Sequence, residues 1–262
     1  MSALAAITTM AERELLNIAR SRSQLYSSVL TPLLFLVFLG NGVSSGLQPA
    51  NLAAGNFTAY LVAGTVVMTS VFSSTFSSAS YFRDRDNGVL RLLLSTPHHP
   101  RVILLGKSLA SLVIGVVQAL VVLVAAAPFV EFEWQHGVIP GFAIAIAAVV
   151  LLNLMLTGLA QAFASRIQSM QGFHLLMNLA LFPLLFFSGA FFPLDGLPVW
   201  LRVMAFANPL TYAVDAMQLA AYAAGDEGFI GLPIDFAVLG TVALLVYALG
   251  LSRIPRLTHS GQ

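Results

Sequence analysis

The sequence contains no cysteine and few charged residues, and both absences narrow the class of protein. Without cysteine the chain cannot form a disulfide, a thiol nucleophile or a cysteine-ligated zinc or iron–sulfur site. Charged residues make up 9% of the chain and hydrophobic residues 58%, whereas soluble domains average about 25% and about 45–50%. So little charge excludes a soluble globular domain, and the high hydrophobicity excludes a disordered chain. The net charge of +1 gives no reason to expect a nucleic-acid partner.

Long uncharged stretches indicate a chain that crosses a membrane several times. Residues 23–82 contain no Asp, Glu, Lys or Arg, and one helix of that length would run about 90 Å, far beyond the ~30 Å hydrocarbon core of a bilayer. A region rich in Gly, Ser, Asn and Pro at 41–56 divides this stretch into two spans. With the later uncharged stretches, the sequence predicts an all-α, single-domain polytopic membrane protein with six transmembrane helices. The predicted spans are 25–42, 57–82, 108–130, 138–165, 172–192 and 234–252.

The basic residues fall almost entirely on one side of the predicted spans. Eleven of the twelve Lys and Arg residues lie before the first span, between the second and third, between the fourth and fifth, or after the sixth. The positive-inside rule makes that side cytoplasmic, so we expect both termini in the cytoplasm and only Arg202 outside. The first apolar stretch lies too far from Met1 for a signal peptide and lacks a convincing cleavage site, so we expect it to be retained as a span.

An amphipathic helix is predicted before the first span, over residues 1–24. Its apolar positions recur at steps of three and four, which is the spacing of one helix face. They are Leu4, Ile7, Ala11, Leu15 and Ile18, while Glu12, Arg13, Asn17 and Arg20 take the opposite face. Such a helix lies in the membrane interface, either as a surface anchor in contact with lipids or as a docking element for a partner protein.

A charged turn and a short apolar helix lie between the second and third predicted spans, at 83–100. Alternating Arg and Asp residues at 83–86 lead through Asn87 and Gly88 into Val89–Leu94, which is too short to cross a bilayer. The spacing does not fit a calcium loop, because Gly88 falls at the fifth position rather than the sixth and the closing Glu is absent. The segment is either a solvated turn or, as its projecting amphipathic helix favours, a docking site for another protein.

Two further motifs suggest chemistry that their context does not support. Gly106-Lys107-Ser108 resembles the end of a phosphate-binding loop, but Arg101 occupies the position of the required glycine. An adjacent pair of histidines at 98–99 lies in a Pro-flanked turn, where two neighbouring side chains seldom converge on one metal ion. We therefore expect no nucleotide site, no metal site and no catalytic centre in this chain.

The interiors of the predicted spans contain polar residues but no charged ones. These polar residues serve either hydrogen bonds between helices or a substrate pathway, and they are Gln118, Asn153, Gln161, His174 and Asn178. Ion-coupled carriers usually keep a titratable carboxylate inside a span, so its absence favours a transporter whose energy comes from a partner chain. An ion-coupled secondary carrier without an ATPase is the alternative. A membrane-embedded enzyme, to which only the Asp84 and Asp86 pair points, is a third possibility.

A proline-broken stretch between the fifth and sixth spans, at 193–233, is predicted to form a short external or re-entrant element. Asn208 followed by Pro209 is a strong helix start, and a helix from Leu210 to Tyr222 would be too short to span the bilayer. Acidic residues are expected to give this element an acidic outer face, and they are Asp195, Asp215, Asp226, Glu227 and Asp235.

Two blocks of residues resemble a known family of membrane transporters. The first is DNGVLRLLLSTP at 86–97, which runs on to Leu105-Gly106-Lys107. The second and more specific block is FSGAFFPLDGLP at 187–198, followed by NPLTY at 208–212 and by Asp215. With the six-span topology, nearly the whole chain is similar to the ABC-2 type permeases. These are the membrane subunits of bacterial ATP-binding-cassette exporters, such as the daunorubicin and nodulation-factor exporters. Family members often carry an acidic residue where this chain has Arg91.

The resemblance implies that transport and ATP hydrolysis reside on different chains. The permease would pair with a second copy of itself, or with a similar permease, and bind two copies of a soluble ABC ATPase that hold ATP and Mg²⁺. This chain would then carry no cofactor and would not be an enzyme. It would lie in the bacterial inner membrane and move a hydrophobic or amphipathic substrate outward, such as a drug, a lipid, or a glycolipid or saccharide.

The resemblance also implies roles for individual residues. The segment that couples to the ATPase comprises Arg83, Asp84, Arg85, Asp86, Asn87, Gly88, Leu90 and Arg91. The interface helix contributes Glu12, Arg13 and Leu15. The pathway lies at the dimer interface, mainly along the first and fifth spans, with the candidates Tyr26, Phe35, His174, Met177 and Asn178. The external element contributes Pro193, Asp195, Asn208, Pro209 and Asp215.

Overall fold

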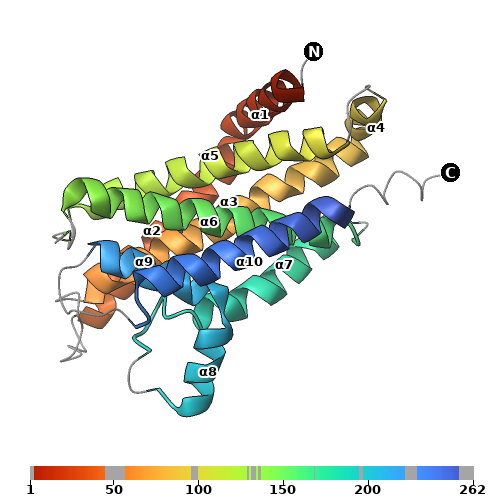
Figure 1. Ribbon diagram of the computed structural model, residues 1–262. Helices are drawn as coiled ribbons and strands as arrows, with labels where there is room; N and C mark the ends of the chain where they lie inside the picture. Colours follow the sequence, from red (N-terminus) through yellow and green to blue (C-terminus); the bar gives the residue numbers. More distant parts are fainter. Residues whose placement is uncertain are drawn as a thin grey trace.

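The computed structural model describes residues 3–44, 57–95, 100–128, 130, 134, 137–167, 169–194, 197–221 and 229–253. Throughout these residues the chain forms α-helices joined by turns, without a β-strand, which confirms the predicted all-α class. In chain order (Figure 1) the helices are α1 (Ala3–Arg20), α2 (Arg22–Ser44), α3 (Phe57–Asp86), α4 (Val89–Leu94), α5 (Pro100–Ala126), α6 (Val138–Ala164), α7 (Met170–Phe186), α8 (Val199–Ala207), α9 (Pro209–Ala221) and α10 (Leu232–Arg253).

Five of the described helices are long and apolar enough to cross a membrane. They are α2, α3, α5, α6 and α10, and α7 is a shorter apolar helix of 17 residues. At 1.5 Å per residue α7 is about 25 Å long, which approaches the ~30 Å hydrocarbon core. These helices follow the order of the predicted spans, as expected for a polytopic membrane protein.

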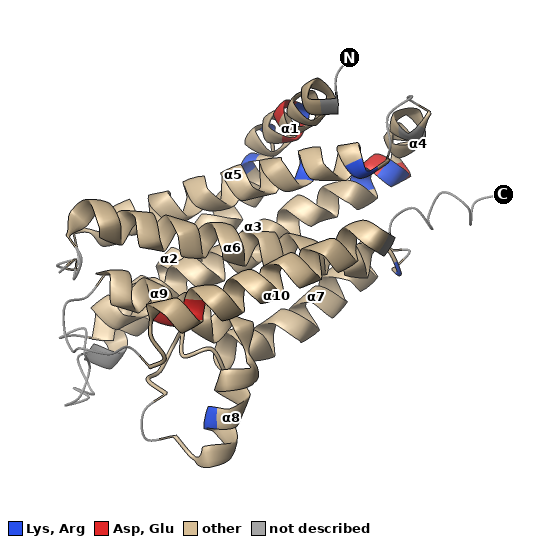
Figure 2. Cartoon of the chain, in the orientation of Figure 1, with Lys and Arg blue, Asp and Glu red and all other residues tan. Residues whose placement is uncertain are grey.

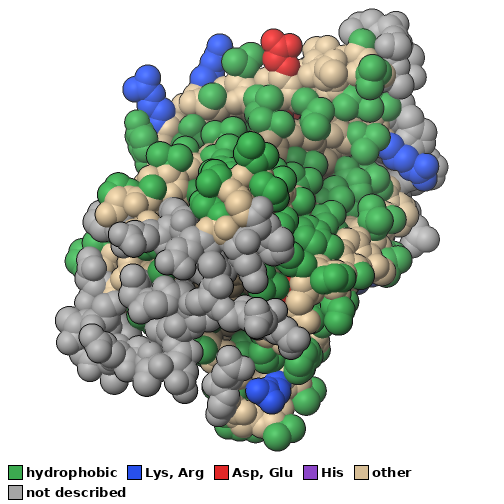
Figure 3. Space-filling model, turned by 60° about the vertical axis from the view of Figure 1, so that its left-hand side comes forward, with side chains coloured by type: hydrophobic (Ala, Val, Ile, Leu, Met, Phe, Trp, Pro, Cys, Tyr) green, Lys and Arg blue, Asp and Glu red, His purple; other side chains and the backbone are tan. Residues whose placement is uncertain are grey.

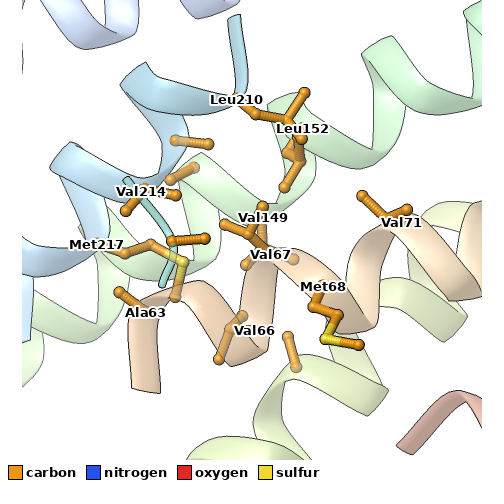
Figure 4. Close-up of a cluster of buried hydrophobic side chains, with 14 of the residues drawn as sticks. Ala63, Val66, Val67, Met68, Val71, Val149, Leu152, Leu210, Val214 and Met217 are labelled. Atoms are coloured by element: carbon orange, nitrogen blue, oxygen red, sulfur yellow. The ribbon is translucent and has the colours of Figure 1, made fainter. Parts of the chain in front are cut away.

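Helix α3 is the centre of the bundle and is buried along most of its length. It packs against α2, α5, α6, α7 and α9, because its many Ser, Thr, Ala and Gly residues let neighbouring backbones approach closely. At Gly64, an added Cβ would overlap the carbonyl group of Ala190. Figure 4 shows the core where α3 meets α6 and α9, with the labelled residues Ala63, Val66, Val67, Met68, Val71, Val149, Leu152, Leu210, Val214 and Met217.

Helices α6 and α10 pack backbone to backbone over two glycines. A Cβ added at Gly158 would lie 2.5 Å from the Cα of Tyr247, and one added at Gly250 would lie 2.7 Å from the carbonyl oxygen of Gly158. Real Cβ atoms do not approach other atoms this closely. The contact therefore requires the absence of a side chain at both positions.

Large apolar side chains cover the lateral surface of the bundle. Exposed Leu, Val and Phe side chains lie on α2, α5, α7 and α10, and Figure 3 shows hydrophobic side chains spread over one face, with charged groups toward its margins. An exposed apolar surface of this extent is unfavourable in water, so it must contact lipid or another protein.

Charged residues gather at one end of the bundle, as Figure 2 shows near α1, α4 and the start of α5. Arg13, Asp84 and Lys107 lie there, and we call it the basic end. The opposite end carries α8, α9 and the start of α10, with Arg202 on α8.

Three features of the opposite end differ from the predicted external element. Residues Val199–Ala207 form α8, a helix that the sequence did not predict. Asp215 and Asp235 are 3% and 0% exposed, so the prediction that these two residues contribute to an acidic outer face is wrong. Helix α10 begins before Asp235, so a carboxylate also lies inside the last apolar helix. The other acidic residues of the predicted face, Asp195, Asp226 and Glu227, lie outside the described residues.

Candidate functional site at the basic end

Four charged side chains from α1, α3 and α5 meet at the basic end, where α1 packs against α5. Lys107 of α5 is central, with its Nζ 3.0 Å from Oε2 of Glu14 and 2.6 Å from Oδ2 of Asp84. The same ammonium group donates a hydrogen bond to Oγ of Ser80 at 3.0 Å. Arg13 holds the other side of Asp84, with its Nη2 2.8 Å from Oδ1. We call Arg13, Glu14, Asp84 and Lys107 the charge cluster.

The charge cluster is largely buried, and its charges balance. The side chain of Glu14 is 1% exposed, and those of Lys107 and Asp84 are 10% and 9% exposed. Hydrogen bonding to Asp84 raises the pKa of the Arg13 guanidinium above its ordinary value. Desolvated charges are stable only when they are paired. Each member therefore depends on the others, and together they fasten α1 to α3 and α5.

The face that α1 turns to the bundle contains an acidic residue among apolar ones. Ala11 and Ile18 of the predicted apolar stripe are buried, and Glu14 lies between them at steps of three and four, equally buried. Of the other two residues predicted for the interface helix, Glu12 is exposed and Leu15 is half-buried. The part of the stripe around Ala11 and Ile18 is therefore a contact with the rest of the bundle, whereas Leu4 at its start is 73% exposed. Within this contact Glu14 pairs with Lys107 rather than with water.

The Gly106-Lys107-Ser108 motif serves this helix packing. A Cβ added at Gly106 would lie 2.5 Å from the Cβ of Met10, so the glycine lets α1 approach α5. Lys107 enters the charge cluster, and the Ser108 hydroxyl accepts a hydrogen bond from Gln161 of α6 at 2.8 Å. All three residues of the motif thus hold helices together.

The predicted coupling segment begins as a continuation of α3. The helix extends beyond the predicted end of the span as far as Asp86. Arg83 donates a hydrogen bond to Gln24 of α2 at 3.3 Å, and Asp84 enters the charge cluster. Arg85 pairs at 3.3 Å with the exposed carboxylate of Asp86. Arg83 and Asp84 thus have partners on other helices. Because of these contacts the chain stays helical as far as Asp86, although a solvated turn was one of the two predicted alternatives for this segment.

A left-handed turn then leads the chain into α4. Gly88 has a φ of +73°, a conformation that glycine adopts without strain, and Asn87 beside it is exposed. In α4, Leu90 is half-buried and Leu92 is 70% exposed. The side chain of Arg91 and residues 96–99 lie outside the described part of the chain. The short helix thus presents an apolar side chain at the basic end.

The predicted pathway residues lie on α2 and α7, which both pack against α3. Tyr26 and Phe35 of α2 are 66% and 42% exposed, and Asn178 of α7 is exposed as well. His174 is half-buried against aromatic rings of α3 and α7. Met177 is fully buried in the core of this chain. The structure therefore separates Met177 from the surface on which Tyr26, Phe35 and Asn178 lie.

Several polar residues of the spans form hydrogen bonds between helices. Three such bonds run from a side-chain amide to a serine hydroxyl and join α5 to α2, α6 to α3 and α6 to α5. The pairs are Gln118 with Ser28 at 2.8 Å, Asn153 with Ser70 at 3.2 Å, and Gln161 with Ser108 at 2.8 Å. Hydrogen bonds between helices and a substrate pathway were the two roles predicted for these polar residues. Gln118, Asn153 and Gln161 have the first role.

A cavity between α3, α5 and α6 adjoins the charge cluster. The space in it that the centre of a water molecule can occupy is about 30 Å³. Its lining consists mostly of polar residues, namely Ser77, Ser78, Ser80, Tyr81, Leu104, Lys107, Ser111, Thr157, Gln161, Ala164 and Ser165. Oε1 of Gln161 has no hydrogen-bond partner among the described residues. A cavity of this size that adjoins Lys107 and the unpaired oxygen of Gln161 can hold water, so water can reach the charge cluster from this side.

Asn208 and Pro209 begin α9 in the way that their residue types predict. The Asn208 side chain accepts a hydrogen bond from the backbone N–H of Leu210 at 3.0 Å, and Pro209 is the first helical residue. The amide group of Asn208 also donates to the carbonyl oxygen of Leu184 at the end of α7. This one side chain therefore caps α9 and connects it to α7.

Asp215 holds the backbone that leads into α10. Its carboxylate accepts hydrogen bonds from three consecutive backbone N–H groups, those of 229–231, at 2.8, 2.8 and 3.2 Å. Pro193 is half-buried in the segment after α7, and Asp195 lies outside the described residues. Of the residues predicted for the external element, Asn208, Pro209 and Asp215 thus organise local backbone structure.

Comparison with known protein families identifies the family of this helical bundle. The ABC-2 type transporter family matches residues 5–222, which include most of α1 and run through α9. The chain belongs to the ABC-2 type transporter family. It is therefore a permease-type membrane subunit, and the family implies an ATPase partner for it. The charge cluster and the α3–α4 turn both lie within the matched part of this ABC-2 permease.

Known proteins of similar sequence include transport permeases and a nodulation protein. The putative transport permease ycf38 of Cyanophora paradoxa is 26% identical over 215 residues, which are 80% of this chain and 71% of that protein. Nodulation protein J of Neorhizobium galegae is 25% identical over 235 residues, 86% of this chain and 81% of that protein. The probable multidrug ABC transporter permease YbhR of Escherichia coli (strain K12) is 25% identical over 149 residues, 57% of this chain and 39% of that protein.

Proposed function

We propose that this ABC-2 permease is the membrane subunit of an ATP-driven exporter that moves a hydrophobic or amphipathic substrate outward across a bacterial inner membrane. The proposed substrate is a drug, a lipid, or a glycolipid or saccharide. Two permease chains, identical or similar, pair in the membrane and bind two copies of a soluble ABC ATPase. ATP and Mg²⁺ act on that partner, and the permease itself does no chemistry. The basic end faces the cytoplasm, where both termini lie.

The charge cluster is the observation that carries this proposal. It joins α1, the predicted interface helix, to α3 just before α3 turns into α4. A force applied by a partner at α1 or at α4 therefore reaches the same two long helices, α3 and α5. Packed protein interiors have low compressibility and transmit displacement. A buried ionic contact at this position suits a subunit that receives mechanical work from another chain.

The transport cycle follows from these connections. ATP draws the two ATPases together, and α1 and α4 move with them. The charge cluster and the hydrogen bond between Arg83 and Gln24 pass this movement to α2, α3 and α5. The exposed surfaces of α2 and α7, which carry Tyr26, Phe35 and Asn178, then rearrange and release the substrate outward. Their aromatic and uncharged character favours an apolar or amphipathic substrate.

Charge reversal in the coupling segment tests the proposal. We expect the triple variant Arg83→Glu, Arg85→Glu and Arg91→Glu to lose either ATPase binding or substrate-stimulated ATP hydrolysis in a complex reconstituted in liposomes. Arg166→Glu is the matched control, because Arg166 is an exposed basic residue between the fourth and fifth predicted spans and outside the coupling segment. Unchanged substrate-stimulated ATP hydrolysis in the triple variant would contradict the docking role.

An ion-coupled carrier predicts a different result. Such a carrier would move substrate in liposomes under an ion gradient with no ATPase present, whereas we expect no transport under those conditions. We also expect a soluble ABC ATPase to co-purify with the permease. Stimulation of that ATPase by a panel of drugs, lipids and glycolipids then identifies the substrate class.

A further inference from the structure

The carboxyl group of Asp235 is buried at the opposite end of the bundle without a hydrogen-bond donor. Asp235 lies in the first turn of α10 and is 0% exposed, and neither of its oxygens has a partner among the described residues. An ionised carboxylate loses its hydration on burial and needs a cation or several donors to replace it. The described side chains around Asp235 supply neither a cation nor a hydrogen-bond donor. An ionised carboxylate would therefore be unfavourable at this position.

Its polar neighbour, Asp215 of α9, is by contrast well supplied with donors. The backbone N–H groups of Phe229 and Ile230 donate to Asp215 at 2.8 Å, and that of Gly231 donates at 3.2 Å. Three hydrogen bonds from N–H groups to one carboxyl group suit its ionised form. Because residues 229–231 lead directly into α10, these bonds also fix where α10 begins.

Asp215 and Asp235 come together at the start of α10, because Gly231 donates its N–H to Asp215 and accepts the N–H of Asp235 at its carbonyl oxygen at 3.1 Å. Figure 2 shows the acidic positions of α9 and α10 side by side. Two ionised carboxylates are both acceptors, so a hydrogen bond between them requires that one carries a proton. Two like charges in contact away from water also repel each other strongly. Both oxygens of Asp215 already accept N–H groups, so the proton resides on Asp235.

The helices packed against α10 bring few other ionisable groups to this position. Helix α10 packs against α6 and α9. The sequence of α6 contains no titratable residue, and α9 contributes Tyr212 in addition to Asp215. Arg202 of α8 lies 5.9 Å from the centre of the Phe229 ring, next to the backbone that donates to Asp215. Among the described residues, Asp215 is therefore the acidic group that determines the environment of Asp235.

We propose that Asp215 and Asp235 form a proton-binding site, in which Asp235 is a neutral carboxylic acid and donates its O–H to ionised Asp215. One proton thereby fastens the start of α10, and the turn at 229–231, to α9. Loss of that proton places two negative charges in contact, so the attachment loosens as the pH rises. The site lies at the opposite end from the charge cluster, and it does not rest on the proposed export function.

Asparagine substitutions distinguish the two members of the pair. Asp235→Asn keeps a donor toward Asp215, because an amide N–H replaces the acid O–H, so we expect the melting temperature of the purified permease in detergent to stay near that of the wild type. Asp215→Asn brings an amide group toward the three backbone N–H donors, so we expect a lower melting temperature. Asp86→Asn, at an exposed residue of the basic end, is the control and should match the wild type.

The proton itself gives the decisive measurement. The infrared spectrum of the wild type should contain the C=O stretching band of a buried carboxylic acid, which Asp235→Asn removes and Asp86→Asn retains. As the pH rises above about 4, where a carboxyl group of the unfolded chain titrates, the wild-type melting temperature should fall, because the folded protein holds a proton that the unfolded chain has released. Asp235→Asn should flatten this fall. A wild type without the band, or an Asp235→Asn variant as unstable as Asp215→Asn, would overturn the proposal.

Discussion

Lys107 pairs with two carboxylates at once, Glu14 and Asp84, and this makes it the residue on which the charge cluster depends. Without Lys107, Asp84 would retain Arg13, but Glu14 would remain buried with no cation beside it. Removal of one partner from a buried pair costs about 3–5 kcal/mol, whereas an exposed salt bridge contributes about 0–1 kcal/mol. The four members of the cluster are therefore unequal in their effect on stability.

We expect Lys107→Met to lower the free energy of unfolding by about 3–5 kcal/mol, as measured by denaturant titration in detergent. The double variant with Glu14→Leu should recover much of this loss, because the unpaired charge is then no longer buried. Arg20→Met is the control at an exposed basic residue of α1, and it should change the free energy by less than about 0.5 kcal/mol. If Lys107→Met behaved like Arg20→Met, the charge cluster would have no stabilising role.

The sequence patterns included Arg13 and Asp84 among the predicted docking residues, but they did not reveal the partners of these side chains. The ion pair between Glu14 and Lys107 joins residues 93 positions apart, and such a contact leaves no local periodicity. One signal was nevertheless present. Glu14 falls three residues after Ala11 and four before Ile18, on the face expected to be buried. A carboxylate on that face requires a cation from elsewhere in the chain.

Among the elements, the contact between α6 and α10 shows how small residues determine packing in a membrane bundle. Lipid chains are as apolar as leucine, so helices associate through close packing and hydrogen bonds rather than through the hydrophobic effect. Gly158 lies directly against the backbone of α10. A side chain on that residue would push the two helices apart and remove contacts along both.

We expect Gly158→Ala to lower the free energy of unfolding by about 1–3 kcal/mol, because its Cβ meets backbone atoms of Tyr247 that cannot rotate away. Gly240→Ala on α10 is the matched control, since the nearest atom to its Cβ would be Cδ1 of Leu151 at 3.9 Å, an ordinary contact. That variant should be neutral or more stable by up to ~1 kcal/mol. Equal melting temperatures for the two variants in detergent would show that α6 and α10 separate at little cost.

Local hydropathy was enough to predict the long helices. The residues at which several of them end could not be predicted, because those ends depend on contacts with other helices. Helix α3 passes the predicted boundary at 82 because its charged end contacts α1, α2 and α5. Helix α8, with nine residues between two prolines, is too short for a periodic pattern to stand out. The start of α9 was predictable, because Asn208 and Pro209 act within a single turn.

On the scale of the whole molecule, the distribution of charge divides the bundle into two unlike ends (Figure 2). The basic end carries α1, α4 and the charge cluster, and the opposite end carries α8 and α9. The positive-inside rule assigns the basic end to the cytoplasm. The natural absence of cysteine makes this assignment easy to test, because an introduced cysteine is the only thiol in the chain.

We expect Val199→Cys, at a residue of α8 that is 79% exposed, to react with a membrane-impermeant maleimide in intact spheroplasts. Thr8→Cys, at an exposed residue of α1, should react only after the membrane is opened. The cysteine-free wild type supplies the background for both measurements. Labelling of Thr8→Cys before Val199→Cys would reverse the proposed orientation and place the ATPase-docking elements on the wrong side.

Composition and local pattern were sufficient to establish an all-helical, polytopic membrane protein and to reveal its resemblance to the ABC-2 permeases. Membrane insertion depends on the hydropathy of about 20 consecutive residues, and the family blocks are contiguous in the chain. Folding alone brought Lys107 to Glu14 and Asp84, and placed Asp235 beside Asp215. In a chain with so few charged residues, the free energy of each buried one depends on a partner from another helix, which local sequence does not specify.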